Sequence, residues 1–281
     1  MAPDVPLYNV VQAFTIHGPL DVPAFRQAFQ TLVEHSDVLR TVIREVDGIP
    51  QQQVQKHVPS FVELVDFSQD TDPQVSYRAW IDKRKTQLLP FVQPLFYTAL
   101  VKLATDQFIW YLAQHHIITD ALSGDLVFKR VAAYYEKALD NRLGQIPLPS
   151  QYAEHIAYEH DLRQTADFQQ AAAYWRKLNQ RPFSPTDFYG RSLQDTSLRA
   201  VRITNDLGPE RSARLREIAR LGSFSSSSSD LSLFTVFATL LFATLQRING
   251  HKTLRLGTPF HGRPTVTSLE IVGLFIEMGL L

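Results

Sequence analysis

The stretch that decides the fold runs from residue 96 to residue 121 and reads FYTALVKLATDQFIWYLAQHHIITDA. Its segments Phe96 to Leu103 and Phe108 to Ala113 are rich in β-branched and aromatic residues, and the four residues between them favour a turn. The stretch therefore predicts a β-hairpin whose second strand runs directly into two adjacent histidines, His115 and His116.

Outward from the hairpin, alternating and helical periodicities predict further elements on both sides. We expect strands over residues 8–17, 38–46, 51–58, 198–204 and 253–259, and helices over 21–35, 72–89, 127–138, 150–178, 209–221 and 231–248. Strands mixed with helices in this way indicate a layered α/β or α+β fold. The apolar stretch from Leu231 to Leu245 is too short to span a bilayer, so we expect a buried helix there.

Composition excludes several classes of protein. The 28 Lys and Arg residues balance 28 Asp and Glu residues, so the electrostatic signature of a nucleic-acid binder is missing. The absence of cysteine excludes disulfides, thiolate metal sites and cysteine nucleophiles. The first residues lack the basic start and apolar core of a signal peptide, which predicts a cytoplasmic protein.

A change in composition predicts two lobes. Residues 181–197 hold two prolines, a glycine and many polar residues, which is typical of a linker. We therefore expect an N-terminal lobe over residues 1–180 and a C-terminal lobe from residue 198 to residue 281.

The histidines lie where a strand ends and a helix is about to begin, a place where catalytic groups are often displayed. His116 could act as a general base near neutral pH, with Asp120 orienting it or bracing the loop. Alternatively, His116 is a hydrogen-bonded structural histidine and Asp120 caps the helix. A metal site is a third interpretation, although adjacent side chains on an extended chain point in opposite directions.

The segment from His115 to Asp120 resembles the HHxxxDG motif of condensation domains from nonribosomal peptide synthetases, members of the chloramphenicol-acetyltransferase-like superfamily. Three further segments resemble motifs of the same family, in the expected order. Glu34 to Thr41 is similar to RHExLRT, and Tyr152 to Tyr158 is similar to YxDYAxW. Gly257 to Pro264, followed by Ile271 to Phe275, is similar to the GTPxxGR and IGxF block.

The resemblance implies a two-lobed fold around a tunnel, with a nearly complete N-terminal lobe and a truncated C-terminal lobe. The implied partners are donor and acceptor carrier proteins and the neighbouring synthetase domains. The carrier proteins would deliver substrates on phosphopantetheine arms, and an acceptor amine would attack the donor thioester. His116 becomes the catalytic histidine, supported by His115 and Asp120. Arg263 is the first candidate to hold Asp120, and Arg40 is the second. Apart from this arm, the sequence indicates no directly bound cofactor, and we expect no metal, no nucleic acid and no membrane as partners.

The sequence also departs from the family pattern. Ala121 stands where the motif has glycine, so either the backbone there is strained because it needs a conformation that only glycine tolerates, or the methyl group is accommodated. Glu34 and Glu277 replace an arginine and an asparagine of the family. The family's opening motif and the rest of its second lobe are missing, which predicts poorly covered apolar surface over residues 231–245 and 274–281. Alternative functions are an epimerisation domain, an ester-forming acyltransferase of the same superfamily, or a non-catalytic module that docks carrier proteins.

Overall fold

The computed structural model describes residues 6–180, 201–251 and 253–281. These residues fall into two compact units. The first unit comprises Met1–Gln169 together with Pro259–Met278, and the second comprises Gln170–Thr258 together with Gly279–Leu281. The predicted linker, residues 181–197, lies outside the described residues, so the boundaries of the two lobes stay a prediction.

The first unit is built on a four-stranded sheet with the order β1-β6-β5-β4. The strands are β1 (Asn9–His17), β4 (Val62–Asp66), β5 (Phe96–Ala104) and β6 (Gln107–His115). β6 pairs antiparallel with β1 and β5, whereas β4 runs parallel to β5. The predicted hairpin is therefore confirmed, with a tighter turn than expected, and it occupies the centre of the sheet. β4 was not predicted.

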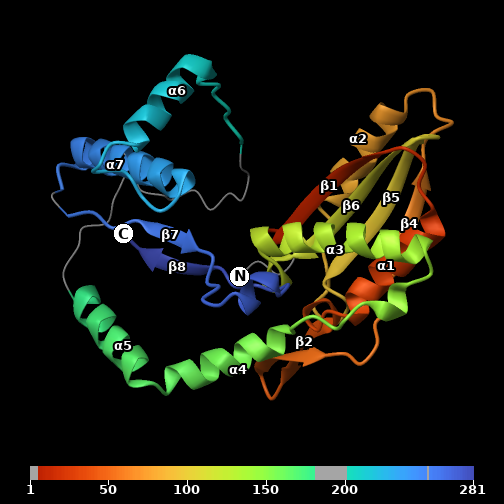
Figure 1. Cartoon of the computed structure of the whole chain (residues 1–281), viewed down its shortest axis with the longest axis horizontal. Coiled ribbons are helices and arrows are strands. Elements are labelled where there is room, and N and C mark those ends of the chain that lie inside the picture. Colours follow the sequence, from red (N-terminus) through yellow and green to blue (C-terminus); the bar gives the residue numbers. More distant parts are fainter. Residues whose placement is uncertain (1–5, 181–200, 252) are drawn as a thin grey trace. The chain divides into compact units, whose positions relative to one another are not determined.

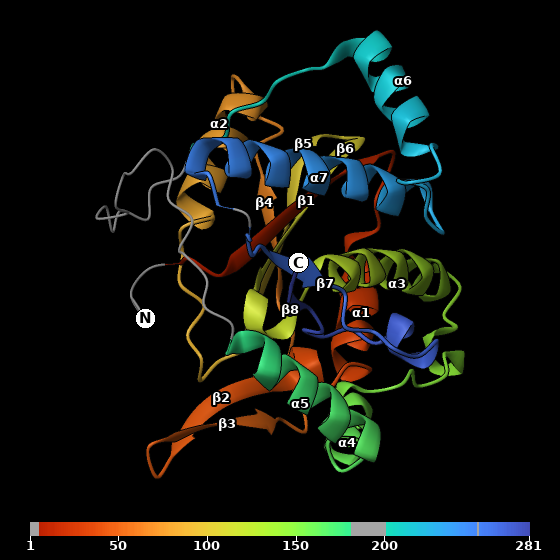
Figure 2. The same cartoon turned by 90° about the vertical axis from the view of Figure 1, so that its left-hand side faces the viewer.

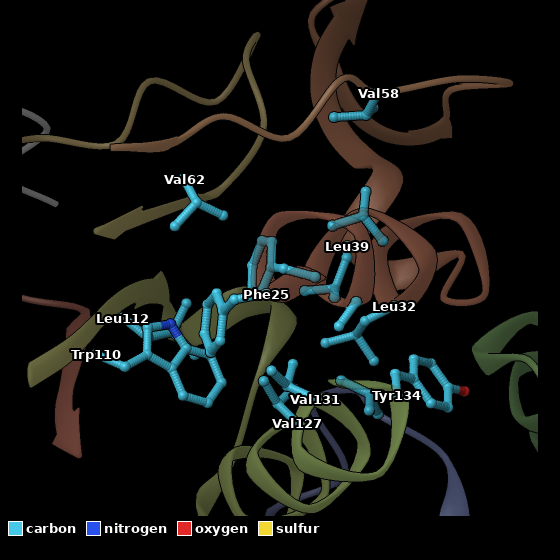
Figure 3. Packing of buried hydrophobic residues seen from close by; sticks show 14 of the residues in the cluster. Phe25, Leu32, Leu39, Val58, Val62, Trp110, Leu112, Val127, Val131 and Tyr134 are labelled. Carbon is cyan, nitrogen blue, oxygen red and sulfur yellow. The ribbon is translucent and has the colours of Figure 1, made fainter. Parts of the chain in front are cut away.

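One face of the sheet is covered by α1 (Val22–Glu34) and α3 (Ala121–Leu139), as Figure 1 shows. α1 begins where its sequence predicts, because the Asp21 carboxylate accepts from Ala24 N at 2.8 Å and Pro23 lies in the first turn. Between helices and sheet lies the main core, in which Trp110 contacts Phe25 and Phe29 edge-on (Figure 3). Burial of each such side chain contributes about 1.5–3 kcal/mol.

The opposite face of the sheet carries α2 (Pro73–Arg84). This helix ends five residues before the predicted end at residue 89 and has no buried residue of its own. Trp80 nevertheless packs edge-on against Tyr111 of β6. Trp110 and Tyr111 are 1% and 0% exposed, so adjacent residues of β6 are buried on opposite faces of the sheet.

A two-stranded ribbon and several short helices complete the first unit. β2 (Thr41–Val46) and β3 (Ile49–Val54) pair around Asp47 and Gly48, and the ribbon extends from the lower part of the unit in Figure 2. The short 3-10 helices are η1 (Val38–Arg40), η2 (His116–Ile118), η3 (Leu143–Gln145) and η4 (Thr267–Glu270).

The single helix expected over residues 150–178 is wrong. The chain instead forms α4 (Tyr152–Arg163) and α5 (Ala166–Asn179), and the break has a local cause. The Thr165 hydroxyl accepts from Phe168 N at 3.2 Å, which starts a new helix. Trp175 of α5 is 43% exposed.

The second unit contains α6 (Gly208–Ala219) and α7 (Ser229–Asn249). The chain also pairs β7 (Gly257–Phe260) with β8 (Glu277–Leu280), of which β8 was not predicted. Of the strand expected over residues 198–204, residues 198–200 lie outside the described residues and residues 201–204 have no regular structure, so this prediction is wrong for its described part.

α7 is not the buried helix that its apolar composition suggested. Its buried residues are Ser232, Val236 and Leu245, and its leucine and phenylalanine side chains at positions 231, 234, 237, 240 and 241 are 41–52% exposed. The expectation of poorly covered apolar surface is therefore confirmed for this stretch. By length and composition alone α7 could cross a membrane, which is weak support for a membrane protein because helices of soluble proteins meet the same criterion.

Candidate active site

The two histidines occupy a turn whose backbone is held from both sides. His115 ends β6 and donates its N–H to Leu95 O at 2.9 Å, and His116 begins η2 and donates its N–H to Tyr8 O at 2.7 Å. Both side chains are half-buried. The motif is thus displayed at the end of a central strand, as the sequence predicted.

The two imidazoles have different surroundings. His115 Nδ1 accepts from Ile117 N at 3.1 Å, and its ring contacts Phe91 and Tyr8. Burial, and secondarily the charge of His116, lower the pKa of His115 below its usual value, which favours the neutral ring. His116 makes no side-chain hydrogen bond among the described residues, so its ring nitrogens remain available to a reacting group.

Asp120 is fully engaged within the protein. It caps α3 by accepting from Ser123 N at 2.8 Å, and its Oδ2 accepts from Phe275 N at 3.1 Å. Arg263 Nη2 donates to both carboxylate oxygens, at 3.0 and 3.1 Å. Both side chains are almost completely buried, so the ion pair is shielded from water. This arrangement suits Asp120 to holding the turn in place, because its lone pairs already serve these donors.

Arg263 also donates hydrogen bonds to backbone carbonyls of the segment that follows it. Its Nη1 donates to Ser268 O at 2.5 Å and to Ile271 O at 2.6 Å, and its guanidinium lies 3.7 Å from the centre of the Phe275 ring. Burial lowers the pKa of Arg263, and the Asp120 carboxylate opposes that shift. The second candidate, Arg40, is used elsewhere: it donates to Gln55 O at 2.7 Å and so holds the chain after β3.

Ser123 is a site residue that the sequence analysis missed. Its hydroxyl donates to Gly273 O at 2.6 Å and accepts from Gly273 N at 2.9 Å and from Arg263 Nη2 at 2.8 Å. Three polar groups therefore meet on one buried hydroxyl in the first turn of α3. A serine three residues after Asp120 signals only a helix start, so sequence could not reveal these long-range bonds.

Asp37, also missed, joins two of the recognised segments. Its carboxylate accepts from Tyr152 N at 2.9 Å and from Ala153 N at 2.8 Å, which caps α4 from a distant part of the chain. The Tyr152 hydroxyl then donates to Leu274 O at 2.6 Å, and burial raises the pKa of Tyr152 to about 12. With the Asp120 and Arg263 bonds, a continuous network connects all four motif-like segments within the first unit.

Two glycines make the close approach of these segments possible. Gly262 has φ +59°, and a Cβ there would lie 1.8 Å from Phe275 O. A Cβ on Gly273 would lie 2.3 Å from the Tyr152 ring. Glycine is therefore required at both positions of the block that resembles GTPxxGR and IGxF.

Removal of the Asp37 carboxylate tests this network. We expect Asp37→Ala to lower the free energy of unfolding by about 2–4 kcal/mol, because three backbone N–H groups, one buried and two partly buried, lose their acceptor. Urea denaturation measures the change. The matched control is Asp72→Ala at the exposed start of α2, where Asp72 accepts from Gln74 N and Val75 N, and where a loss of about 1 kcal/mol is expected. Equal losses in the two variants would contradict the prediction.

Of the two alternatives for Ala121, the structure supports an accommodated methyl group and not a strained backbone. Ala121 is the exposed first residue of α3, and it is not among the described residues with positive φ. Helical backbone accepts alanine without penalty, whereas glycine there loses more conformational freedom on folding. We expect Ala121→Gly to lower the free energy of unfolding by about 0.5–1 kcal/mol in urea denaturation. A more stable variant would show that alanine is strained after all.

No group of three or more His, Asp or Glu side chains that could hold a metal ion occurs in the part of the chain that the structure describes. The site offers the imidazole of His116, which makes no side-chain hydrogen bond to any described residue, in a turn next to the buried ion pair of Asp120 and Arg263.

Comparisons with known proteins identify the family of this chain. The family model described as Condensation domain matches residues 1–279. Tyrocidine synthase 3 of Brevibacillus parabrevis is 27% identical over 277 residues, which cover 96% of this chain and 4% of that protein. Nonribosomal peptide synthetase kk1B of Curvularia clavata is 28% identical over 271 residues, or 94% of this chain and 2% of that one.

Solved structures share the fold. A starter condensation domain of rhizomide synthetase RzmA, crystallised with C8-CoA and Leu-SNAC, matches with a TM-score of 0.80 and 24% identity over all of this chain and 61% of that one. The first condensation domain of the calcium-dependent antibiotic synthetase, in complex with a substrate analogue, matches with a TM-score of 0.74 and covers 65% of that chain. The chain thus shares the fold of these condensation domains and spans 61% and 65% of their length. From its sequence motifs, its site and these matches, the chain belongs to the condensation-domain family of nonribosomal peptide synthetases.

Proposed function

We propose that this chain provides the site for condensation-type acyl transfer, in which an amide bond forms between a carrier-bound acyl or peptidyl thioester and an amine acceptor. The observation that carries the proposal is the unoccupied imidazole of His116, held beside the buried pair of Asp120 and Arg263. His116 accepts a proton from the acceptor amine or positions it, and the amine nitrogen attacks the thioester carbonyl carbon. The C–N bond forms, the C–S bond breaks, and the proton passes to the departing thiolate.

His115, Asp120 and Arg263 act through the turn that presents His116. His115 fixes η2 by accepting from Ile117 N, and Asp120 fixes the start of α3. Their role is positioning, since Nδ1 of His115, the carboxylate of Asp120 and both Nη atoms of Arg263 already form hydrogen bonds within the protein. Arg40 supports the chain after β3, and among the described residues no hydrogen bond or ion pair joins it to Asp120.

Substrates, partners and location follow from the proposed reaction. Donor and acceptor carrier proteins bring the reacting groups on phosphopantetheine arms, and neighbouring synthetase domains load them in the cytoplasm. The chain spans 61–66% of the solved condensation-domain chains it matches and at most 10% of the synthetases, so these partners belong to the proposal.

A single-turnover assay tests the proposal. An acyl or aminoacyl donor on a holo-carrier protein is mixed with an aminoacyl acceptor on a second carrier, and the products are measured by mass spectrometry. Amide formed only in the presence of the chain supports the proposal. Ester formed with a hydroxyl acceptor would indicate an ester-forming acyltransferase, and exchange of the donor α-proton with deuterated water would indicate epimerisation.

Absence of turnover in this assay would favour the alternative of a non-catalytic docking module. The exposed apolar face of α7 is a surface suited to protein contacts, which favours a docking module as the second candidate function. A folded chain that binds carrier protein and transfers no acyl group would establish that candidate and overturn condensation.

A further inference from the structure

His155 of α4 is a buried imidazole that the proposed reaction does not use. It is 7% exposed, and its Nε2 lies 3.3 Å from Glu159 Oε1, one helical turn further along α4. In the motif YxDYAxW, which the segment from Tyr152 to Tyr158 resembles, this position holds tyrosine. The chain therefore carries a side chain that can gain a positive charge near neutral pH where the motif has one that stays neutral.

Phe275 joins His155 to the ion pair beside the candidate active site. The ring centroids of His155 and Phe275 are 4.3 Å apart, and the Arg263 guanidinium lies 3.7 Å from the centre of the same Phe275 ring. The Phe275 N–H also donates to Asp120 Oδ2 at 3.1 Å. One residue thus contacts the imidazole and both members of the buried ion pair, and all of these residues belong to the first unit.

Charged groups of both signs surround the imidazole. Among the described residues, the titratable groups that face it are Glu154, Glu159, Tyr152 and Tyr158 of α4, and Arg263 of the segment that follows β7. The Glu154 carboxylate is already an acceptor for Gln151 N at 3.0 Å. A proton on His155 is therefore attracted by Glu159 and repelled by Arg263.

We propose that His155 is a positioning residue for the reaction at His116, and that its protonation loosens the turn that presents His116. Protonation strengthens the attraction between the imidazole and Glu159, and it places a second cation against the aromatic ring that Arg263 already occupies. Both effects disturb the packing of Phe275, whose N–H and ring contact the buried ion pair. The kinetic consequence rests on the proposed function, whereas the coupling of His155 to Arg263 rests on these contacts alone.

The coupling is measured by NMR on the whole chain without substrates. The ring signal of His155 and the Nε–H signal of Arg263 are followed from about pH 5 to about pH 8, the range in which histidine changes its charge. We expect both signals to shift with a common midpoint. The Arg263 shift should disappear in His155→Tyr and in His155→Gln, in which the side chain stays neutral. The matched control is His160→Tyr, which removes an exposed histidine of the same helix and should leave the Arg263 shift unchanged.

The rate of amide formation provides a second measurement. We expect the single-turnover rate of His155→Tyr, divided by that of the unmodified chain, to rise from about one at about pH 8 to about 3–10 at about pH 5.5, because one cation near an aromatic ring changes free energies by this order. The ratio removes the ionisation of His116, which both proteins share. A merely structural effect of the substitution changes the rate equally at both pH values.

These measurements separate the proposal from its alternatives. An Arg263 signal that does not move with pH, or that moves equally in His155→Tyr, would overturn the proposal, and so would a rate ratio that is the same at both pH values. If the larger tyrosine prevents folding, His155→Gln takes its place in both measurements. NMR coupling in a chain that forms no amide would refute condensation and leave the coupling of His155 to Arg263 standing.

Discussion

Replacing Arg263 by methionine is expected to lower the free energy of unfolding of the first unit by about 3–5 kcal/mol, the largest loss for any single side chain of the network. Methionine fills much of the same volume, so the loss comes from the polar atoms left behind. Asp120 keeps a buried carboxylate without its cation, and the Ser268 and Ile271 carbonyls lose their donor. Burying an unpaired charge is far more costly than losing an exposed ion pair.

Urea denaturation of the variant measures this loss, and two further variants identify its cause. Arg40→Met removes an arginine that binds backbone carbonyls without an ion pair, and we expect a loss of about 1–2 kcal/mol. In the double variant Asp120→Asn, Arg263→Met, part of the loss should be recovered because the uncompensated charge is gone. If Arg263→Met costs no more than Arg40→Met, the buried pair does not hold the turn.

Much of the sheet could be predicted from the sequence, because the relevant signals are local. The segments from Phe96 to Leu103 and from Phe108 to Ala113 carry strong strand propensity on both sides of a turn, and the structure places them as adjacent strands. β4 lacks such a signal: it is five residues long and pairs in parallel with β5, more than thirty residues further along the chain. A pairing of this kind leaves no hairpin pattern.

The errors in the helices have physical reasons as well. The periodicity of residues 150–178 continues across Thr165, whose capping bond interrupts the helix. The apolar composition of α7 predicts a helix, which the structure confirms, but composition does not indicate what covers its apolar side chains. Burial depends on the remaining surface of the fold, so Phe237 at 50% exposed could not be predicted.

The sequence predicted the motif residues of the candidate site, but it did not predict the contacts that join them. His115, His116, Asp120 and Arg263 stand at positions that match family motifs. Ser123 and Asp37 act through bonds to residues 150 and more than 110 positions away. Such long-range bonds follow no sequence periodicity and no fixed spacing, so they can be identified only in the three-dimensional structure.

The second large effect is expected at His116. We expect His116→Ala to lower the single-turnover rate of amide formation by about 10²–10⁴-fold, the contribution typical of a positioned general base. Its imidazole is half-buried and unbonded to other described side chains, so the free energy of unfolding should change by less than about 1 kcal/mol. Loss of rate without loss of stability is the combination that separates a catalytic group from a structural one.

The neighbouring histidine provides the matched control, because His115 differs from His116 in its partners and not in its chemistry. His115→Ala removes the acceptor of Ile117 N, so it should reduce stability by about 1 kcal/mol and reduce the rate only through the displaced turn. Added imidazole can replace a missing base and cannot rebuild a turn. Rescue of His116→Ala, with none for His115→Ala, would place the proton transfer on His116, whereas an unchanged rate in His116→Ala would remove it from the mechanism.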